Sequence, residues 1–282
     1  MKPRSPTWRR VSNRIVTGVS ALGSLAGIFV LGWILYEVIM RGANAIGPAF
    51  FTQRPPPPGT EGGGMGPAIL GTLLITVMAT VIGVPIGLMT GIYLAEYGKK
   101  SSLAAAVRFA TNVLMGVPSI IVGVFVYFIL VMKAGTFSAH AGAAALAIIM
   151  LPIVGRTSED MIALVPNALR EAALALGTPR WKVILSIVFR AARPALVTGS
   201  LLAVARVSGE TAPLLFTALN SPYWLDSLSQ PTANLTVTIF QFAMAPYDNW
   251  QQLAWGASLL ITVGVLFLNI TARFMFRGGK TA

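Results

Sequence analysis

Cysteine is absent from the chain, and histidine occurs once, as His140. The lack of cysteine excludes disulfide bonds, thiolate metal sites and a cysteine nucleophile, and a single histidine excludes any site that needs two. Charged residues make up only 11% of the 282 positions, whereas a soluble globular domain has about 25%. So few charges cannot cover a water-facing surface of this size. Together with the 55% share of hydrophobic residues, they indicate a membrane protein.

The sequence also lacks the signature of an ATPase. A phosphate-binding loop needs a glycine, then four residues, then Gly-Lys-Ser/Thr. The Gly-Lys pairs at 98–99 and 279–280 have Tyr93 and Phe274 where the first glycine should stand. The sequence contains no nucleophile–base set and no cluster of metal ligands. We therefore expect no catalytic residue, no metal site and no cofactor, and we interpret His140 as a solvated or capping residue at the outer edge of an apolar stretch.

Six apolar stretches are predicted to be transmembrane helices, since about 20 apolar residues cross the ~30 Å hydrocarbon core. The first follows a basic segment and is too long for a signal peptide, so it is predicted to be retained. The fourth is short for a full span and has Pro152 near its end. The predicted fold class is all-α, a polytopic membrane protein with six transmembrane helices. The predicted spans are 15–39, 68–97, 109–132, 139–154, 194–219 and 253–274.

The basic residues are distributed unevenly between the two sides of these spans. Of the 21 Lys and Arg residues, Arg41, Arg54 and Lys133 lie on one side, Arg206 lies within a span, and the others fall on the opposite side. Because Lys and Arg concentrate in cytoplasmic loops, both termini are predicted to be cytoplasmic. A net charge of +12 that arises from membrane topology needs no nucleic-acid partner.

The predicted organisation has three parts. Residues 1–66 hold the N-terminal cytoplasmic segment, the first span and an external loop with four consecutive prolines, 55–58, followed by glycines. Consecutive prolines favour a stiff extended segment, and glycines a flexible one. We interpret this loop as a surface connection, with contact to an external partner as the alternative. Residues 67–276 are predicted to form the transmembrane core, and 277–282 a cytoplasmic tail.

A long cytoplasmic loop before the fifth span contains a predicted short helix. Pro166 and Asn167 favour its start, and the acidic Glu171 suits the positive end of the helix macrodipole. Gly177 is predicted to end the helix, and Pro179 suits the start of the next one. The loop should therefore present a short helix that projects from the membrane.

The fifth span contains two ionisable residues, Arg206 and Glu210. An arginine at the bilayer centre costs about 2.5–3.5 kcal/mol on insertion scales, and such residues usually mark a functional pathway. The spacing of four predicts that both side chains share one helical face. Arg206 is expected to face a water-filled route and to contact a tetrahedral oxyanion through its planar fork of donors. Glu210 would orient Arg206, or moderate its attraction so that the anion can leave. The alternative is a structural ion pair that fixes the rotation of the helix.

The loop helix resembles a known family pattern. The run Glu171-Ala172-Ala173, followed after three residues by Gly177, resembles the EAA…G loop of importer-type ABC permeases. Ile187 falls where that pattern has isoleucine, whereas 189–190 are Phe and Arg where it has leucine and proline. The resemblance implies the importer-type (type I) ABC permease fold. It also implies that this helix sits in a cleft of an ATPase and transmits its motion.

The resemblance extends to the phosphate-importer branch of that family. The runs 150–152, 156–157, 171–182 and 209–215 resemble the second of the branch's two permease subunits, and the likeness covers about 66–274. It implies a non-catalytic, multi-pass permease subunit of the bacterial inner (cytoplasmic) membrane that transports inorganic phosphate. The implied partners are a sister permease in a heterodimer, two copies of a cytoplasmic ATP-binding subunit, an external phosphate-binding protein and membrane lipid. The implied site residues are Arg206, Glu210 and Thr211 on the substrate pathway and Glu171, Ala172, Ala173 and Gly177 for coupling to the ATPase.

Other interpretations stay open. An arginine in a pore would also suit an importer of another oxyanion, such as sulfate or molybdate. A secondary transporter would use an ion gradient, but such proteins often have inverted repeats with paired broken helices, and the sequence shows no second counterpart of the Arg206 helix. A membrane enzyme would need a set of catalytic residues, and the sequence contains none. The loop helix could also rest on lipid, although the apolar face formed by Leu169, Ala173 and Leu176 is small and would bind weakly.

Overall fold

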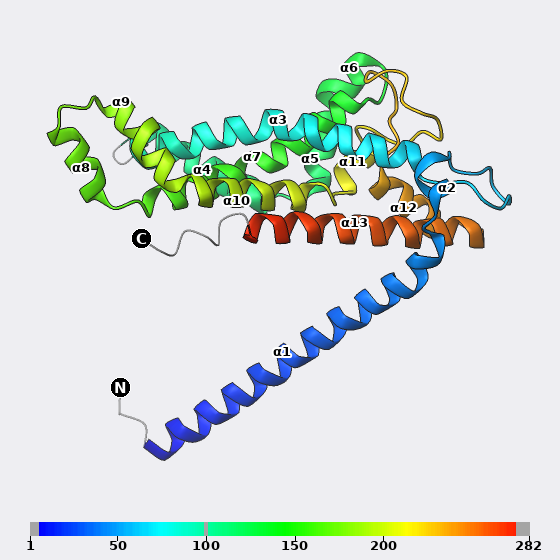
Figure 1. Cartoon of the computed structure of the whole chain (residues 1–282), viewed down its shortest axis with the longest axis horizontal. Coiled ribbons are helices and arrows are strands. Elements are labelled where there is room, and N and C mark those ends of the chain that lie inside the picture. Colours follow the sequence, from blue (N-terminus) through cyan, green and yellow to red (C-terminus); the bar gives the residue numbers. More distant parts are fainter. Residues whose placement is uncertain (1–5, 99–100, 275–282) are drawn as a thin grey trace.

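The computed structural model describes residues 6–98 and 101–274, and every regular element in these ranges is a helix (Figure 1). The basic residues predicted at positions 2, 4, 99, 100, 277 and 280, and the predicted tail 277–282, lie outside the described residues. The elements in the first half are α1 Pro6–Gly42, η1 Ala43–Ala45, α2 Pro48–Thr52, α3 Gly66–Glu96, α4 Ser102–Gly116, α5 Ser119–Val126, the π-helix η3 Tyr127–Val131 and α6 Met132–Ala134. Those in the second half are α7 Ala139–Ala163, α8 Asn167–Ala175, α9 Arg180–Val183, the π-helix η4 Ile184–Val188, α10 Phe189–Val207, α11 Ala212–Leu215, α12 Leu235–Ala243 and α13 Asp248–Phe274.

Five helical stretches are long and apolar enough to cross a membrane, and a sixth span is possible if one bent helix pair counts as one. This agrees with the predicted number of spans. The fifth span, however, lies earlier in the chain than predicted. It is the continuous stretch Arg180–Val207, formed by α9, η4 and α10, in place of 194–219. The other long stretches are Arg10–Ala45, Gly66–Glu96, Ala139–Ala163 and Asp248–Phe274.

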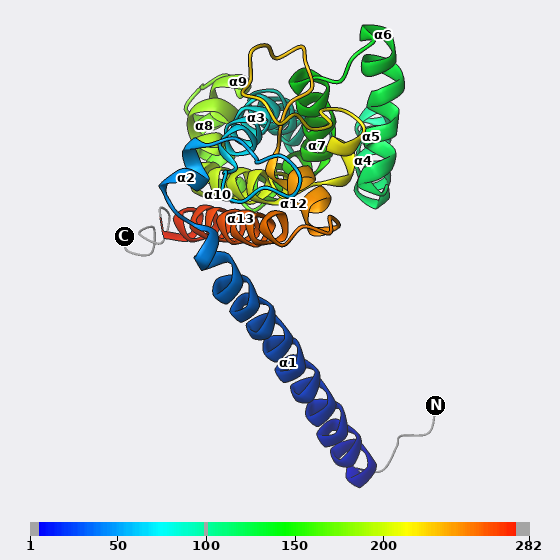
Figure 2. The ribbon, with the colours of Figure 1, turned by 90° about the vertical axis from the view of Figure 1, so that its right-hand side faces the viewer.

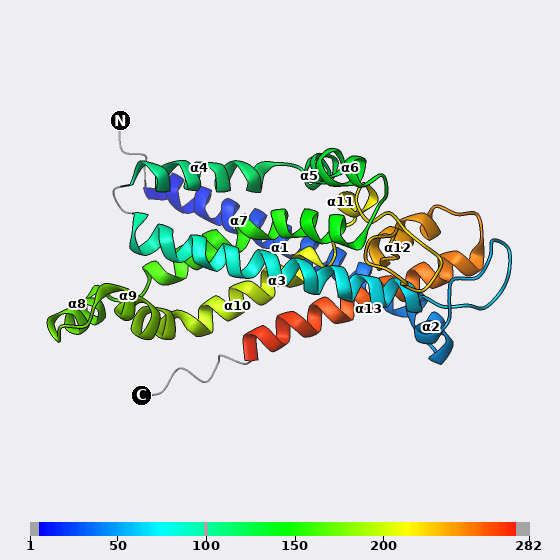
Figure 3. The same ribbon diagram turned by 90° about the horizontal axis from the view of Figure 1, so that it is seen from above.

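The third predicted span is broken. The helices Ser102–Gly116 and Ser119–Ala134 meet at an angle of 105°, so the predicted transmembrane helix over 109–132 is not one continuous helix. Val117, which precedes Pro118, has the extended backbone that a following proline favours (φ −73°, ψ 129°). Figure 3 shows α4 along one edge of the bundle, with α5 and α6 turned away from its line.

The fourth span is longer than predicted. Helix α7 continues through Pro152 to Ala163 and has 25 residues. Pro152 is buried within the bundle, where neighbouring helices help a proline to be accommodated in a transmembrane helix. The same helix therefore reaches from the α6 side of the bundle to the segment that carries α8.

Helices α3 and α7 pack closely along a line of small residues. Gly83 approaches Met150, Gly87 approaches Val154, and a Cβ atom at Gly91 would lie only 2.4 Å from Ser158 Cβ. Small residues allow this backbone approach, which is a main source of helix association in lipid. The largest apolar cluster, including Ile75, Leu146, Met150 and Val154, surrounds this contact.

Helix α1 leaves the bundle at an angle and packs against it only near its C-terminal end (Figures 1 and 2). At that end a Cβ atom on Gly42 would lie 2.7 Å from the Trp255 carbonyl oxygen of α13. None of the apolar window of α1 is buried inside the chain. Figure 1 also shows that α1 begins, and α13 ends, toward the end of the molecule that carries α8 and α9.

The proline-rich loop between α2 and α3 is held against α13. The Trp250 indole N–H donates to the Pro56 carbonyl oxygen at 3.1 Å, and the Asn249 side-chain amide donates to the carbonyl oxygens of Thr60 and Gly62. Pro56 is buried. The predicted surface connection is therefore fixed in place by side chains from the last helix.

Candidate functional site

The short helix in the long loop forms where the sequence predicts it. Helix α8 begins after Pro166 and ends before Gly177, whose φ of +77° favours glycine. The Thr178 N–H donates to the Ala173 carbonyl at 3.2 Å, and the Gly177 N–H to that of Leu174 at 2.9 Å. These two bonds form a Schellman motif, which satisfies the last carbonyl groups of a helix. Pro179 precedes α9, as predicted.

The four residues predicted to contact an ATPase do not share one surface. Glu171, Ala172 and Gly177 are exposed, whereas Ala173 is 6% exposed and packs in an apolar cluster with Ile162, Val183 and other residues. Ala173 thus anchors α8, and its neighbours remain accessible. The apolar face considered for lipid binding is not formed, because Ala173 points into the protein.

Arg206 and Glu210 do not lie on the same helix in the structure. Helix α10 ends at Val207, so Arg206 lies in its last turn and Glu210 lies beyond it. The prediction that both residues lie mid-helix, on one face, is therefore wrong, because the chain leaves the helix at 208–209. The Glu210 carbonyl oxygen instead accepts a hydrogen bond from Thr236 Oγ1 at 3.0 Å. Within the described residues, Arg206 and Glu210 do not form the ion pair that was considered as an alternative.

Arg206 and Glu210 nevertheless line the same cavity. Its volume is about 270 Å³, and its walls come from the end of α4, the break before α5, the middle of α7 and the end of α10. The other lining residues are Leu114, Met115, Val117, Pro118, Ser119, Val122, Ile148, Ile149 and Ile153. The cavity therefore brings one cation, one carboxylate and one hydroxyl together among apolar side chains.

Ser119 was not singled out from the sequence, and Thr211 does not line the cavity. The signal for Ser119 was available, because the Pro118-Ser119 pair interrupts an otherwise apolar stretch. Thr211 directly follows Glu210 and precedes α11, where its carbonyl oxygen accepts the N–H of Leu214 at 3.1 Å. Helix α11 packs on α5, since a Cβ atom at Gly123 would lie 2.6 Å from Pro213 Cα.

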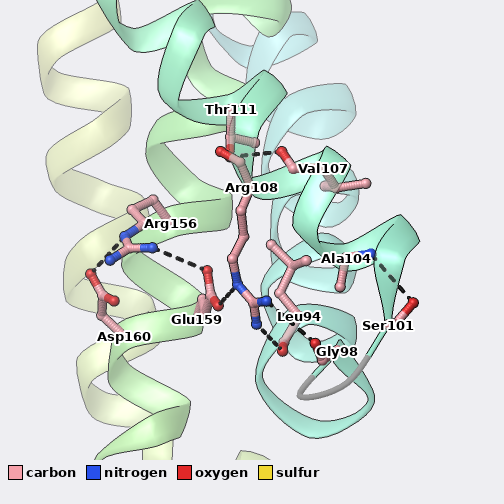
Figure 4. Close-up of polar contacts among 10 residues, drawn as sticks. All are labelled: Leu94, Gly98, Ser101, Ala104, Val107, Arg108, Thr111, Arg156, Glu159 and Asp160. Atoms are coloured by element: carbon pink, nitrogen blue, oxygen red, sulfur yellow. Dashed lines mark hydrogen bonds and ion pairs between the residues drawn. The ribbon is translucent and has the colours of Figure 1, made fainter.

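A network of charged residues joins three helices around Arg108, in the N-terminal half of α4 (Figure 4). Arg108 Nε donates to Glu159 Oε1 at 2.6 Å, and its other nitrogens donate to the carbonyl oxygens of Leu94 and Gly98. Arg156 also pairs with Glu159, at 3.5 Å, and with Asp160, at 3.3 Å. This network fastens α4 to α3 and α7.

His140 is exposed, and its Nδ1 lies 3.0 Å from the Leu228 carbonyl oxygen. A histidine that contacts a loop carbonyl in this way agrees with the predicted solvated or capping role. Among the described residues, no group of three His, Cys, Asp or Glu side chains could hold a metal ion.

Sequence comparison matches residues 83–278 to the family described as "Binding-protein-dependent transport system inner membrane component". The "Phosphate transport system permease protein PstA" of Yersinia pestis is 52% identical over 98% of this chain and 94% of its own length. The protein of the same name from Haemophilus influenzae is 48% identical over 97% of this chain and 96% of its own length. A "PstA 1" protein of Mycobacterium tuberculosis is 38% identical over 94% of this chain and 88% of its own length.

Solved structures support the fold. A chain of a bacterial alginate ABC transporter, in complex with an alginate-bound periplasmic protein, aligns over 97% of this chain and 98% of its own, with a TM-score of 0.66 at 15% identity. A chain of the methionine ABC transporter MetNI in an inward-facing conformation covers 76% of this chain and 94% of its own, with a TM-score of 0.63 at 19% identity. The chain therefore belongs to the inner membrane components of binding-protein-dependent ABC importers, in the branch of the phosphate transport system permeases PstA.

Proposed function

We propose that this chain forms half of the translocation pathway of an ATP-driven phosphate importer, and that Arg206 contacts the anion in that pathway. The observation that carries the proposal is the cavity at the end of α10. Its lining includes Arg206, and no described residue provides a hydrogen bond or an ion pair to that guanidinium. An arginine that lines a cavity and lacks a protein partner has its donors available for a transported oxyanion.

The other polar residues of the cavity have complementary roles in this proposal. Ser119 supplies a hydroxyl donor, and Glu210 supplies a negative charge that moderates the attraction of Arg206. A conducting site must bind its ion weakly enough to release it, and a nearby carboxylate has this effect on an anion. Thr211 is also proposed as a pathway residue. The reason is its position next to Glu210, because Thr211 itself does not line the cavity.

Membership of this family implies an ATPase and a binding protein as partners. We propose that α8 is the contact with the ATPase, through Glu171, Ala172 and Gly177, with Ala173 as the anchor. The proposed assembly contains a sister permease, two ATPase copies and an external phosphate-binding protein. Both termini would be cytoplasmic, because α1 begins and α13 ends toward the end that carries α8 (Figure 1). The proposed core is 67–276, preceded by α1 and its loop.

The proposed cargo and energy source can be tested in cells whose only phosphate importer contains this chain and its sister permease. Uptake of labelled phosphate should require ATP, and an excess of unlabelled phosphate should suppress it while sulfate and molybdate do not. Preferential suppression by sulfate or molybdate would instead indicate another oxyanion. Uptake that survives ATP depletion and collapses with the ion gradient would indicate a secondary transporter.

A further inference from the structure

Helix α8 is held to the rest of the protein by few side chains. A helix of nine residues is marginal in water by itself. Its Glu171, Ala172 and Leu174 are exposed, so they contribute little to its position. Two residues three positions apart face the protein, namely Ala173 in the apolar cluster and Arg170, whose side chain is only 16% exposed.

Arg170 makes the polar contacts of this face. Its Nε and Nη2 atoms donate to Glu96 Oε1, at 3.0 and 2.7 Å. Nη2 also donates to the Ile162 carbonyl oxygen at 2.9 Å, and Nη1 donates to the carbonyl oxygen of Val165 and, at 3.4 Å, to Asn167 Oδ1. Glu96 is 8% exposed. A nearly buried carboxylate is therefore matched by one arginine from α8.

These contacts join α8 to the ends of two long helices. Glu96 is the last residue of α3, Ile162 lies in the last turn of α7, and Val165 follows that helix. The last carbonyl groups of a helix have no partner within it. Arg170 donates to the carbonyl oxygen of Ile162, which also accepts the Val165 N–H at 3.2 Å, while it pairs with Glu96 of α3. One side chain of α8 thus contacts both α3 and α7.

Helix α7 continues from this point to the cavity of Arg206, and α3 packs along it. They pack together through Gly83, Gly87 and Gly91, and α7 supplies Ile148, Ile149 and Ile153 to the cavity wall. Packed helices and ion pairs are the physical elements that carry energetic coupling between distant sites. A displacement of α8 through Arg170 would therefore move the helix that forms one wall of the cavity.

We propose that Arg170 is the positioning residue that transmits movement of α8 to α3 and α7, and thereby to the substrate cavity. This proposal rests on the coupling role of α8 proposed above. A purely structural role for Arg170 would require that its loss detach or unfold α8. The structure provides other attachments, because Ala173 remains packed, Arg180 donates to the Glu96 carbonyl oxygen, and the Arg180 guanidinium lies 5.0 Å from the Tyr97 ring centre.

The test uses the complete importer in proteoliposomes with the external binding protein and phosphate. Arg170→Gln should leave the amount of co-purified ATPase unchanged. Stimulation of ATP hydrolysis by the loaded binding protein, and phosphate uptake per ATP, should fall by about 2- to 30-fold. Glu96→Gln should have the same effect, and the double variant should be no worse than either single one. Arg170→Lys, which keeps the charge but loses the fork, should be intermediate.

The matched control is Arg190→Gln, because Arg190 is an exposed arginine of the following span with no ion pair to a described residue. In this variant, the stimulation of ATP hydrolysis by the loaded binding protein and the uptake of phosphate should remain at the wild-type level. Normal stimulation and uptake in Arg170→Gln would overturn the proposal. A loss of uptake in proportion to lost complex would also overturn it, since that result indicates a structural role. If the wild-type permease does not retain the ATPase, the coupling role of α8 fails, and this proposal fails with it.

Discussion

At the scale of single residues, two kinds of arginine matter for this chain. Arg108 and Arg170 are surrounded by carboxylate and carbonyl oxygens that use their donors. Arg206 lines a cavity, and its guanidinium has no such partner among the described residues. Because arginine stays charged in proteins, the first kind stabilises helix contacts and the second kind suits an anion that comes and goes.

The network in Figure 4 gives a stability prediction at this scale. Arg108→Gln removes the 2.6 Å partner of Glu159, whose side chain is only 10% exposed. We expect the free energy of unfolding to fall by about 1–3 kcal/mol, because a nearly buried charge loses its best hydrogen bond. The control is Arg156→Gln, which removes a longer contact from a side chain that is 43% exposed and should cost less than about 1 kcal/mol. Thermal unfolding of the purified complex measures the loss of stability in each variant. Equal losses in Arg108→Gln and Arg156→Gln would contradict the prediction.

At the scale of elements, proline shows why part of the fold was predictable and part was not. The apolar stretches located most of the long helices, although the fifth begins and ends earlier than predicted. Pro85, Pro152 and Pro194 lie inside helices, whereas Pro118 stands at a 105° break. A proline removes one backbone donor in every case. Whether the helix continues depends on neighbours that satisfy the freed groups, and those neighbours come from distant parts of the chain.

The short helix α8 was predictable because its signals are local. Pro166 and Gly177 mark its two ends, and both positions agree with the structure. The spacing of Arg206 and Glu210 predicts a shared face only if the helix continues through both residues. The Ser208-Gly209 pair between them is a sequence signal for the end of a helix. The cavity that brings these two residues together depends on the broken α4–α5 pair, which no local pattern specifies.

A glycine pair tests the role of α8 as a whole element. Gly177 and Gly135 both have positive φ, +77° and +71°, and a Cβ atom at either would meet no atom within 4 Å. Alanine should therefore cost each site a similar strain of about 1–2 kcal/mol. Gly177→Ala should reduce the amount of ATPase that co-purifies with the permease, whereas Gly135→Ala should not. Equal retention of the ATPase in both variants would count against α8 as the contact.

At the scale of the whole molecule, the chain has the surface of a subunit. The apolar window of α1 is entirely exposed within this chain, and such a surface belongs in lipid or against another subunit. The membrane character and the family follow from composition and from a few motifs. The arrangement of the cavity follows from packing between α4, α5, α7 and α10, and it required the structure.

The central claim is that Arg206 contacts phosphate during import, and the most direct test is phosphate uptake by the reconstituted importer with Arg206→Gln. The variant should assemble with its ATPase in normal amount and lose uptake, because a neutral amide cannot replace the charged fork. Arg190→Gln, on the same helix and outside the cavity, should transport normally. Wild-type uptake by the Arg206→Gln importer would contradict the account.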